Sequence, residues 1–145
     1  MKTSGRVLIV DDDGTVLRSF RNVLASANFT VQAAKTGDEA LDMLAHQVFD
    51  VVLVEHPMPR NDGLAVLRTI KSLWPDTEVV VITGAPSVQH AKEAIRLGAC
   101  DYLAKPVPPD VVIKAAASAA MKKKWAMRRI SIQDLAQPTH QGASS

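Results

Sequence analysis

Four short apolar segments of this chain each end directly on a polar residue, and this pattern restricts the fold more than any other feature. The segments and their endings are residues 7–10 with Asp11 and Asp12, residues 51–54 with Glu55, residues 79–82 with Thr83, and residues 102–104 with Lys105. The first three consist of four consecutive Val, Leu or Ile residues, which is typical of strands that are buried on both faces of a parallel sheet.

Apolar residues at helical spacing follow each predicted strand, so strands and helices alternate along the chain. A short strand is expected near residues 29–33, Thr36 and Ser87 are suitable N-caps, and Gly98 is a suitable helix end. Residues 88–97 carry apolar side chains at helical spacing, and the last helix is expected from near Pro109 to about residue 129. The fold class predicted is α/β, with one doubly wound five-stranded parallel sheet and helices on both faces.

Length and composition favour one folded domain with a short appendage. The chain has 145 residues, and no apolar run approaches the roughly 20 residues that span a bilayer. The first residues lack the apolar core of a signal peptide. The single cysteine, Cys100, excludes an internal disulfide bond and is expected to be a small buried residue. These features predict a cytoplasmic protein without a membrane segment.

Charge is distributed unevenly along the chain. Residues 1–120 hold 12 Lys and Arg against 14 Asp and Glu, whereas residues 121–130 add five basic residues and no acid. We therefore divide the chain into a domain at 1–120 and a segment at 121–145 that consists of a basic helix end followed by a disordered tail or linker. The cations at 122–124 are expected to be solvated, with a nucleic-acid or partner contact near Trp125 as the alternative, and the main domain is not expected to bind nucleic acid directly.

The polar strand endings predict a common site. Right-handed crossovers place the carboxyl ends of parallel strands along one edge of the sheet, where open α/β sheets bind ligands. Asp11, Asp12 and Glu55 would repel one another there, and a hard cation such as Mg²⁺ relieves this repulsion. Lys105 can pair with a phosphoryl oxygen, and Thr83 offers a hydroxyl donor to the same group. The sequence thus predicts a site that binds a divalent cation and a phosphoryl group.

The order and spacing of these residues resemble the receiver domain of bacterial two-component response regulators. The resemblance covers roughly residues 5–120. It is carried by Asp11-Asp12, by Asp50 and Glu55 followed by His-Pro-Met58-Pro59 and Asp62-Gly63, by Thr83-Gly84-Ala85, and by Asp101-Tyr102-Leu103-Ala104-Lys105-Pro106. It implies a flavodoxin-like strand order of 2-1-3-4-5, which the chemotaxis receiver of this family also has.

The resemblance also implies the roles of individual residues. Mg²⁺ would be bound by Asp11, Asp12, the acceptor side chain and the backbone carbonyl of Pro57. Lys105 and Thr83 would contact the phosphoryl group, and Thr83 with Tyr102 would form the switch pair that reports phosphorylation.

The partners that the resemblance implies are a histidine kinase or phosphotransfer protein and an effector domain beyond the C-terminus. A homodimer through the fourth helix, fifth strand and fifth helix is a further expectation. No residue is assigned a catalytic role, because the expected function is signalling and not enzymatic turnover.

One position departs from the family pattern. Glu55 stands where the family has the aspartate that accepts the phosphoryl group, and its extra methylene moves the carboxylate toward Thr83 and Lys105. A displacement of ~1 Å can slow group transfer by ~100-fold, so phosphorylation is expected to be impaired and Glu55 to imitate the active state in part. Both a natural glutamate and an engineered Asp→Glu change are compatible with this sequence. His56, the next residue, is expected to be a solvated loop histidine, with metal binding or control of access to the site as the alternative.

Two other functions stay open at this stage. A receiver-like module that acts through its surfaces, without phosphate, is one of them. The other is a haloacid-dehalogenase-type phosphohydrolase, because residues 10–16 resemble its first motif with Asp11 as nucleophile and Asp13 as general acid/base. That enzyme needs a second acidic pair after Lys105, where this sequence offers only Asp110 and Asp134 in poor context.

Overall fold

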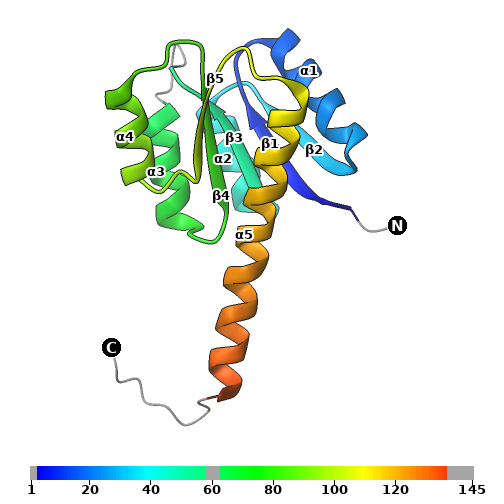
Figure 1. Cartoon of the computed structure of the whole chain (residues 1–145), viewed down its shortest axis with the longest axis vertical. Coiled ribbons are helices and arrows are strands. Elements are labelled where there is room, and N and C mark those ends of the chain that lie inside the picture. Colours follow the sequence, from blue (N-terminus) through cyan, green and yellow to red (C-terminus); the bar gives the residue numbers. More distant parts are fainter. Residues whose placement is uncertain (1–2, 58–62, 137–145) are drawn as a thin grey trace.

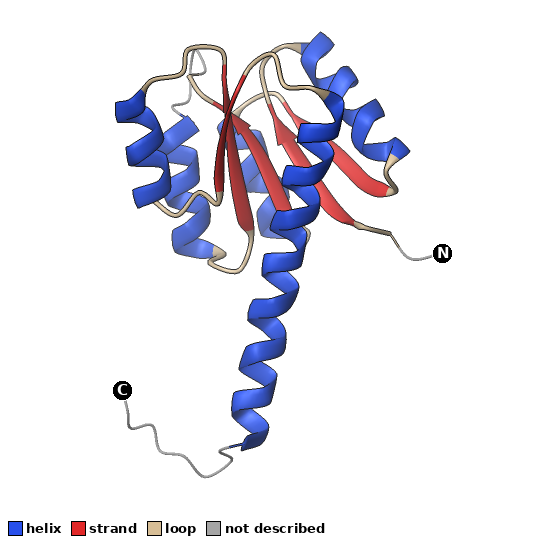
Figure 2. Cartoon of the chain, viewed as in Figure 1, coloured by secondary structure: helices blue, strands red, loops and turns tan. Residues whose placement is uncertain are grey.

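Strands and helices alternate along the described chain, as the sequence pattern predicts. A computed structural model describes residues 3–57 and 63–136, with side chains described as far as residue 123. Figure 1 labels the elements and Figure 2 separates helices from strands. In chain order they are β1 (Gly5–Val10), α1 (Gly14–Ser26), β2 (Phe29–Ala34), α2 (Gly37–His46), β3 (Val51–Glu55), α3 (Gly63–Leu73), β4 (Glu78–Thr83), α4 (Val88–Arg96), β5 (Asp101–Ala104) and α5 (Pro109–Ala136).

The five strands form one parallel sheet in the order β2-β1-β3-β4-β5, which confirms the predicted fold class. Two apolar clusters lie on its two faces. One joins alternate residues of the central strands to α1 and α5, and the other joins the remaining strand residues to α2, α3 and α4. The central strands are buried on both faces, which explains their uninterrupted apolar sequences.

Three of the helices have a polar residue at the N-cap position, and its side chain accepts hydrogen bonds from the first turn. Asp13 accepts from the backbone N–H groups of Thr15 and Val16, Thr36 accepts from Glu39, and Ser87 accepts from His90. The N-caps predicted at Thr36 and Ser87 are therefore confirmed.

Helices α4 and α5 differ from the simplest expectation. Within α4 only Ala94 is buried, whereas Val88 and Ile95 are 72% and 54% exposed, so the apolar spacing of this helix does not mark a wholly buried face. Helix α5 continues to Ala136, beyond the predicted end near residue 129. Among the described residues, no helix is long and apolar enough to cross a membrane.

Gly63, the first residue of α3, lies against the end of β3. A Cβ atom at this position would be 2.4 Å from the carbonyl oxygen of Glu55 and 2.9 Å from the Cβ of His56. Both contacts are closer than atoms can approach, and the nearer one is to backbone, which cannot rotate away. A residue without a side chain is therefore required where α3 begins beside the strand that carries Glu55.

We predict that Gly63→Ala lowers the free energy of unfolding by about 1–3 kcal/mol, because the added methyl group forces α3 away from β3. Gly14→Ala is the matched control, since Gly14 also begins a helix and its added Cβ would meet only Arg18 at 3.8 Å. The control is expected to be neutral or up to about 1 kcal/mol more stable. Urea unfolding of both variants checks this, and equal stability of the two would refute the close-packing argument.

Candidate functional site

Three carboxylates converge at the carboxyl edge of the sheet. Val10 and Val54 are neighbours in the β1–β3 pairing, so Asp11 and Asp12 follow β1 beside the place where β3 ends in Glu55. One carboxylate oxygen from each of the three residues lies within 4.8 Å of the others. Asp11 is almost completely buried, Glu55 is half-buried and Asp12 is exposed. The predicted convergence is therefore present.

Lys105 links two of these carboxylates. Its Nζ atom lies 3.1 Å from Oδ2 of Asp11 and donates a second hydrogen bond to Oε1 of Glu55. Its backbone N–H donates to the carbonyl of Thr83 at 2.7 Å, which holds the start of the β5–α5 loop against the end of β4. The side chain thus reaches from β5, across β4, to the ends of β3 and β1.

The site destabilises negative charge on Glu55. Burial has the largest effect and, with the nearby charge of Asp11 and a hydrogen bond to Asp12, raises the pKa of Glu55 to about 7, against the lowering effect of Lys105. Burial alone would lower the pKa of Lys105, but its hydrogen bonds to Glu55 and Asp11 outweigh burial and raise it. The site therefore carries an excess of acidic groups over cationic ones, which favours a bound cation.

Thr83 and Tyr102 lie next to this site but make contacts elsewhere. Thr83 is completely buried, and its Oγ1 atom accepts a hydrogen bond from the backbone N–H of Ala85 at 2.9 Å. The Tyr102 hydroxyl accepts from the backbone N–H of Ser87 at 3.3 Å, and its ring packs against the apolar cluster on the α4 side. Both side chains therefore contact the segment that leads from β4 into α4.

His56 corrects one expectation from the sequence. A histidine directly after the strand end was expected to be a solvated loop residue, but His56 is only 6% exposed. Its ring lies edge-on to the ring of His90 in α4, with 4.9 Å between the centroids. Gly63 lies close to the Cβ atom of His56, so the start of α3 also adjoins this residue.

Several motif residues are not part of the described site. Met58, Pro59 and Asp62 lie outside the described residues, and Pro57 is exposed at the last described position before that gap. Asp13 caps α1, which accounts for this carboxylate without an acid/base role.

A cavity of about 500 Å³ next to Lys105 was not predicted. It lies between α1 and the β5–α5 loop and is lined by Val16, Phe20 and Pro106 among others.

Comparisons with known proteins match most of this chain to one family. Residues 7–117 match the response regulator receiver domain family. The chain is 34% identical over 130 residues to the alginate biosynthesis transcriptional regulatory protein AlgB of Pseudomonas aeruginosa, covering 90% of this chain and 29% of AlgB. It is 32% identical over 142 residues to the C4-dicarboxylate transport transcriptional regulatory protein DctD of Rhizobium meliloti, covering 98% of this chain and 31% of DctD.

A solved structure shares the fold. NtrX from Brucella abortus superimposes with a TM-score of 0.81 at 27% identity, covering 97% of this chain and 31% of NtrX. The chain belongs to the response regulator receiver domain family of two-component systems. It spans less than a third of the length of these three relatives. Neither the described geometry nor these similarities support the phosphohydrolase alternative.

We predict that Lys105→Met raises the pKa of Glu55 above about 7 in metal-free protein, because the substitution removes the one cation that stabilises this carboxylate among the described contacts. Carbon-detected NMR titration of the Glu55 carboxyl in the presence of EDTA measures the change. Lys92→Met, which removes an exposed lysine from α4, controls for net charge. An unchanged Glu55 titration in the Lys105 variant would contradict the described contact.

Proposed function

We propose that this receiver domain has its phosphoacceptor position at Glu55 and that the glutamate holds the site in a partly activated state. The observation that carries the proposal is the contact of Lys105 with both Asp11 and Glu55. In the proposed role Lys105 pairs with a phosphoryl oxygen, and here the longer glutamate side chain already brings a carboxylate to the same ammonium. Glu55 thereby replaces one interaction of the phosphoryl group.

Imitation of the phosphoryl group is partial for electrostatic reasons. A carboxylate carries one negative charge, whereas a phosphoryl group carries about −1.5 to −2 and offers three acceptor oxygens. Burial also raises the pKa of Glu55 to about 7, so part of its charge is neutralised at neutral pH when no cation is bound. The Thr83 hydroxyl also supports partial imitation, because its described hydrogen bond is with the backbone N–H of Ala85 in the β4–α4 segment and not with Glu55.

Mg²⁺ is the proposed cation of this site. Asp11, Asp12 and Glu55 supply oxygen ligands at compatible distances, and hard divalent cations prefer such ligands. The backbone carbonyl of Pro57 is proposed as a fourth ligand, because the family resemblance implies it. When bound, the cation would neutralise the charge that gathers at a transferred phosphoryl group.

The output of the domain is proposed to pass through Thr83 and Tyr102 to α4, β5 and α5. Tyr102 already contacts the N-terminal end of α4 through Ser87. Val88 and Ile95 are exposed apolar residues seven positions apart, so they lie on the same side of α4. This surface suits the proposed homodimer contact.

The partners are inferred from the family. A histidine kinase or phosphotransfer protein would approach the carboxyl edge, where the cavity beside Lys105 opens between α1 and the β5–α5 loop. The relatives AlgB, DctD and NtrX extend far beyond the matched region, which supports an effector domain after α5. Transcriptional regulation is the proposed output, because AlgB and DctD are named as transcriptional regulators.

A phosphate-independent interaction module is the second candidate. The same Lys105 contacts favour it, because the ammonium is already paired with two carboxylates before any phosphoryl group arrives. The two candidates predict different results for an aspartate at position 55, because only a functional receiver site would then accept a phosphoryl group.

We predict that the chain forms little acyl phosphate with acetyl phosphate and Mg²⁺, and that Glu55→Asp restores phosphorylation at residue 55. The expected difference in rate is about 100-fold, since in-line transfer depends on the position of the attacking oxygen to within ~1 Å. Intact-mass spectrometry after short incubation measures it, and Glu55→Gln is the inactive control. Rapid modification of Glu55 itself would refute the proposed role of the glutamate, and an unmodified Glu55→Asp variant would favour the phosphate-independent module.

We also predict that Mg²⁺ stabilises the folded chain and that Asp12→Asn removes this effect. At about a hundred times its dissociation constant, a ligand that binds only the folded state adds about 2.7 kcal/mol. Urea unfolding with Mg²⁺ and with EDTA measures the difference. Asp76→Asn, an exposed acid in the loop before β4, should leave the Mg²⁺ effect intact; equal stabilisation of both variants would exclude the acidic cluster as the binding site.

A further inference from the structure

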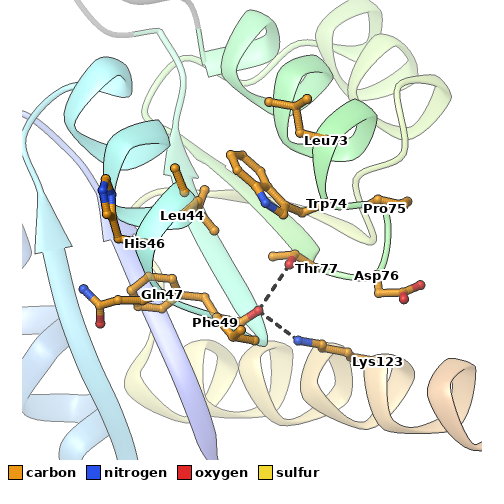
Figure 3. A pocket seen from close by; sticks show the side chains of 12 residues that line it. Leu44, His46, Gln47, Phe49, Leu73, Trp74, Pro75, Asp76, Thr77 and Lys123 are labelled. Atoms are coloured by element: carbon orange, nitrogen blue, oxygen red, sulfur yellow. Dashed lines mark hydrogen bonds between the residues drawn. The ribbon is translucent and has the colours of Figure 1, made fainter.

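A buried lysine joins helix α5 to the amino edge of the sheet, opposite the acidic site. Lys123 is only 7% exposed, although the sequence predicts a solvated cation within the basic segment. Its Nζ atom donates to the carbonyl oxygen of Phe49 at 3.2 Å (Figure 3). The same atom lies 3.5 Å from Oδ1 of Asp50. A buried ammonium is costly unless it is paired and hydrogen-bonded, so these two partners account for its position.

The segment that Lys123 contacts is itself firmly held. Oδ2 of Asp50 accepts from the backbone N–H of Arg6 at 2.8 Å, and the Phe49 carbonyl also accepts from the Thr77 hydroxyl at 3.2 Å. The backbone of Asp50 bonds to Arg6 on one side and to Glu78 on the other. The contact for Lys123 is therefore tied to β1 and β4 as well as to β3.

Most of the α5 side chains that pack on the sheet are small. The buried ones are Val112, Ala115, Ala116, Ala119 and Ala120, and Ile113 is a larger side chain that is partly buried against the same cluster. Alanines allow close packing but interlock little, so they oppose rotation or sliding of a helix only weakly. A charged contact of fixed geometry at Lys123 supplies the restraint that the alanines lack.

The contact of Lys123 lies beside the strand that ends in Glu55. Asp50 directly precedes β3, and Glu55 is the last residue of the same strand. Helix α5 continues past the sheet to Ala136 and leads away from the domain (Figure 1). Lys123 therefore connects the strand that carries the acceptor position to the helix that leaves the domain.

We propose that Lys123 is a positioning residue that fixes the rotation and axial position of α5 against the amino end of β3, and so sets the direction in which α5 leaves the domain. This role is separate from cation binding and from phosphorylation at Glu55. It needs only the packing of α5 and the pairing with Phe49 and Asp50.

The test is hydrogen–deuterium exchange of the full 145-residue chain with Lys123→Met, which keeps the apolar stem and removes the ammonium. Amides of α5 from about residue 119 onward should exchange about tenfold faster, while amides of β1, β3 and β4 keep their protection. Lys122→Met is the matched control, because Lys122 is the exposed neighbour on the same helix and should exchange like the original chain. Lys123→Arg should restore protection, since a guanidinium can reach both partners.

Two results would overturn the proposal. In the first, Lys123→Met and Lys122→Met give the same exchange in α5. In the second, Lys123→Met raises exchange equally in α5 and in the strands, which would make Lys123 a general contributor to stability and not a positioning residue. If Lys123→Met does not fold, Lys123→Gln gives a second comparison, because its shorter, neutral side chain removes the charge pairing with Asp50 and is itself polar.

Discussion

The mutual repulsion of carboxylates at the ends of parallel strands is the constraint on which the rest of this domain depends. A parallel sheet brings its strand ends to one edge, and this chain puts Asp11, Asp12 and Glu55 there within 4.8 Å of one another. Burial, together with the nearby charge of Asp11, raises the pKa of Glu55 to about 7. Lys105 offsets part of the negative charge with one ammonium. The remaining charge is what the proposed divalent cation would neutralise.

The proposed function depends on the length of the side chain at position 55. An aspartate there would be one methylene shorter and would keep its carboxylate nearer the strand. The glutamate extends by one methylene and contacts Lys105 directly. In the proposed function, this reach both weakens Glu55 as a nucleophile and lets it replace part of the phosphoryl group. Impaired phosphorylation and partial activation would then be two results of a single change in side-chain length.

The sequence predicts the elements of this structure better than the environment of single side chains. Consecutive apolar residues mark the buried strands, and their polar endings give Asp11, Glu55 and Lys105, because topology alone brings strand ends together. The strand order is not visible in the residues and came from the family resemblance. The burial of His56 was not predicted because it depends on tertiary neighbours, among them His90 in α4 and Gly63 at the start of α3. No local pattern reports such a tertiary contact.

The sequence contains a signal for the burial of Lys123, but a second signal points to exposure. It lies three and four residues after Ala120 and Ala119, on the side of α5 that faces the sheet, yet its place among consecutive lysines favoured a solvated position. Helical periodicity, and not local charge, decides which of these cations is buried. The two ends of β3 consequently each carry a charged contact, Glu55 with Lys105 and Asp50 with Lys123.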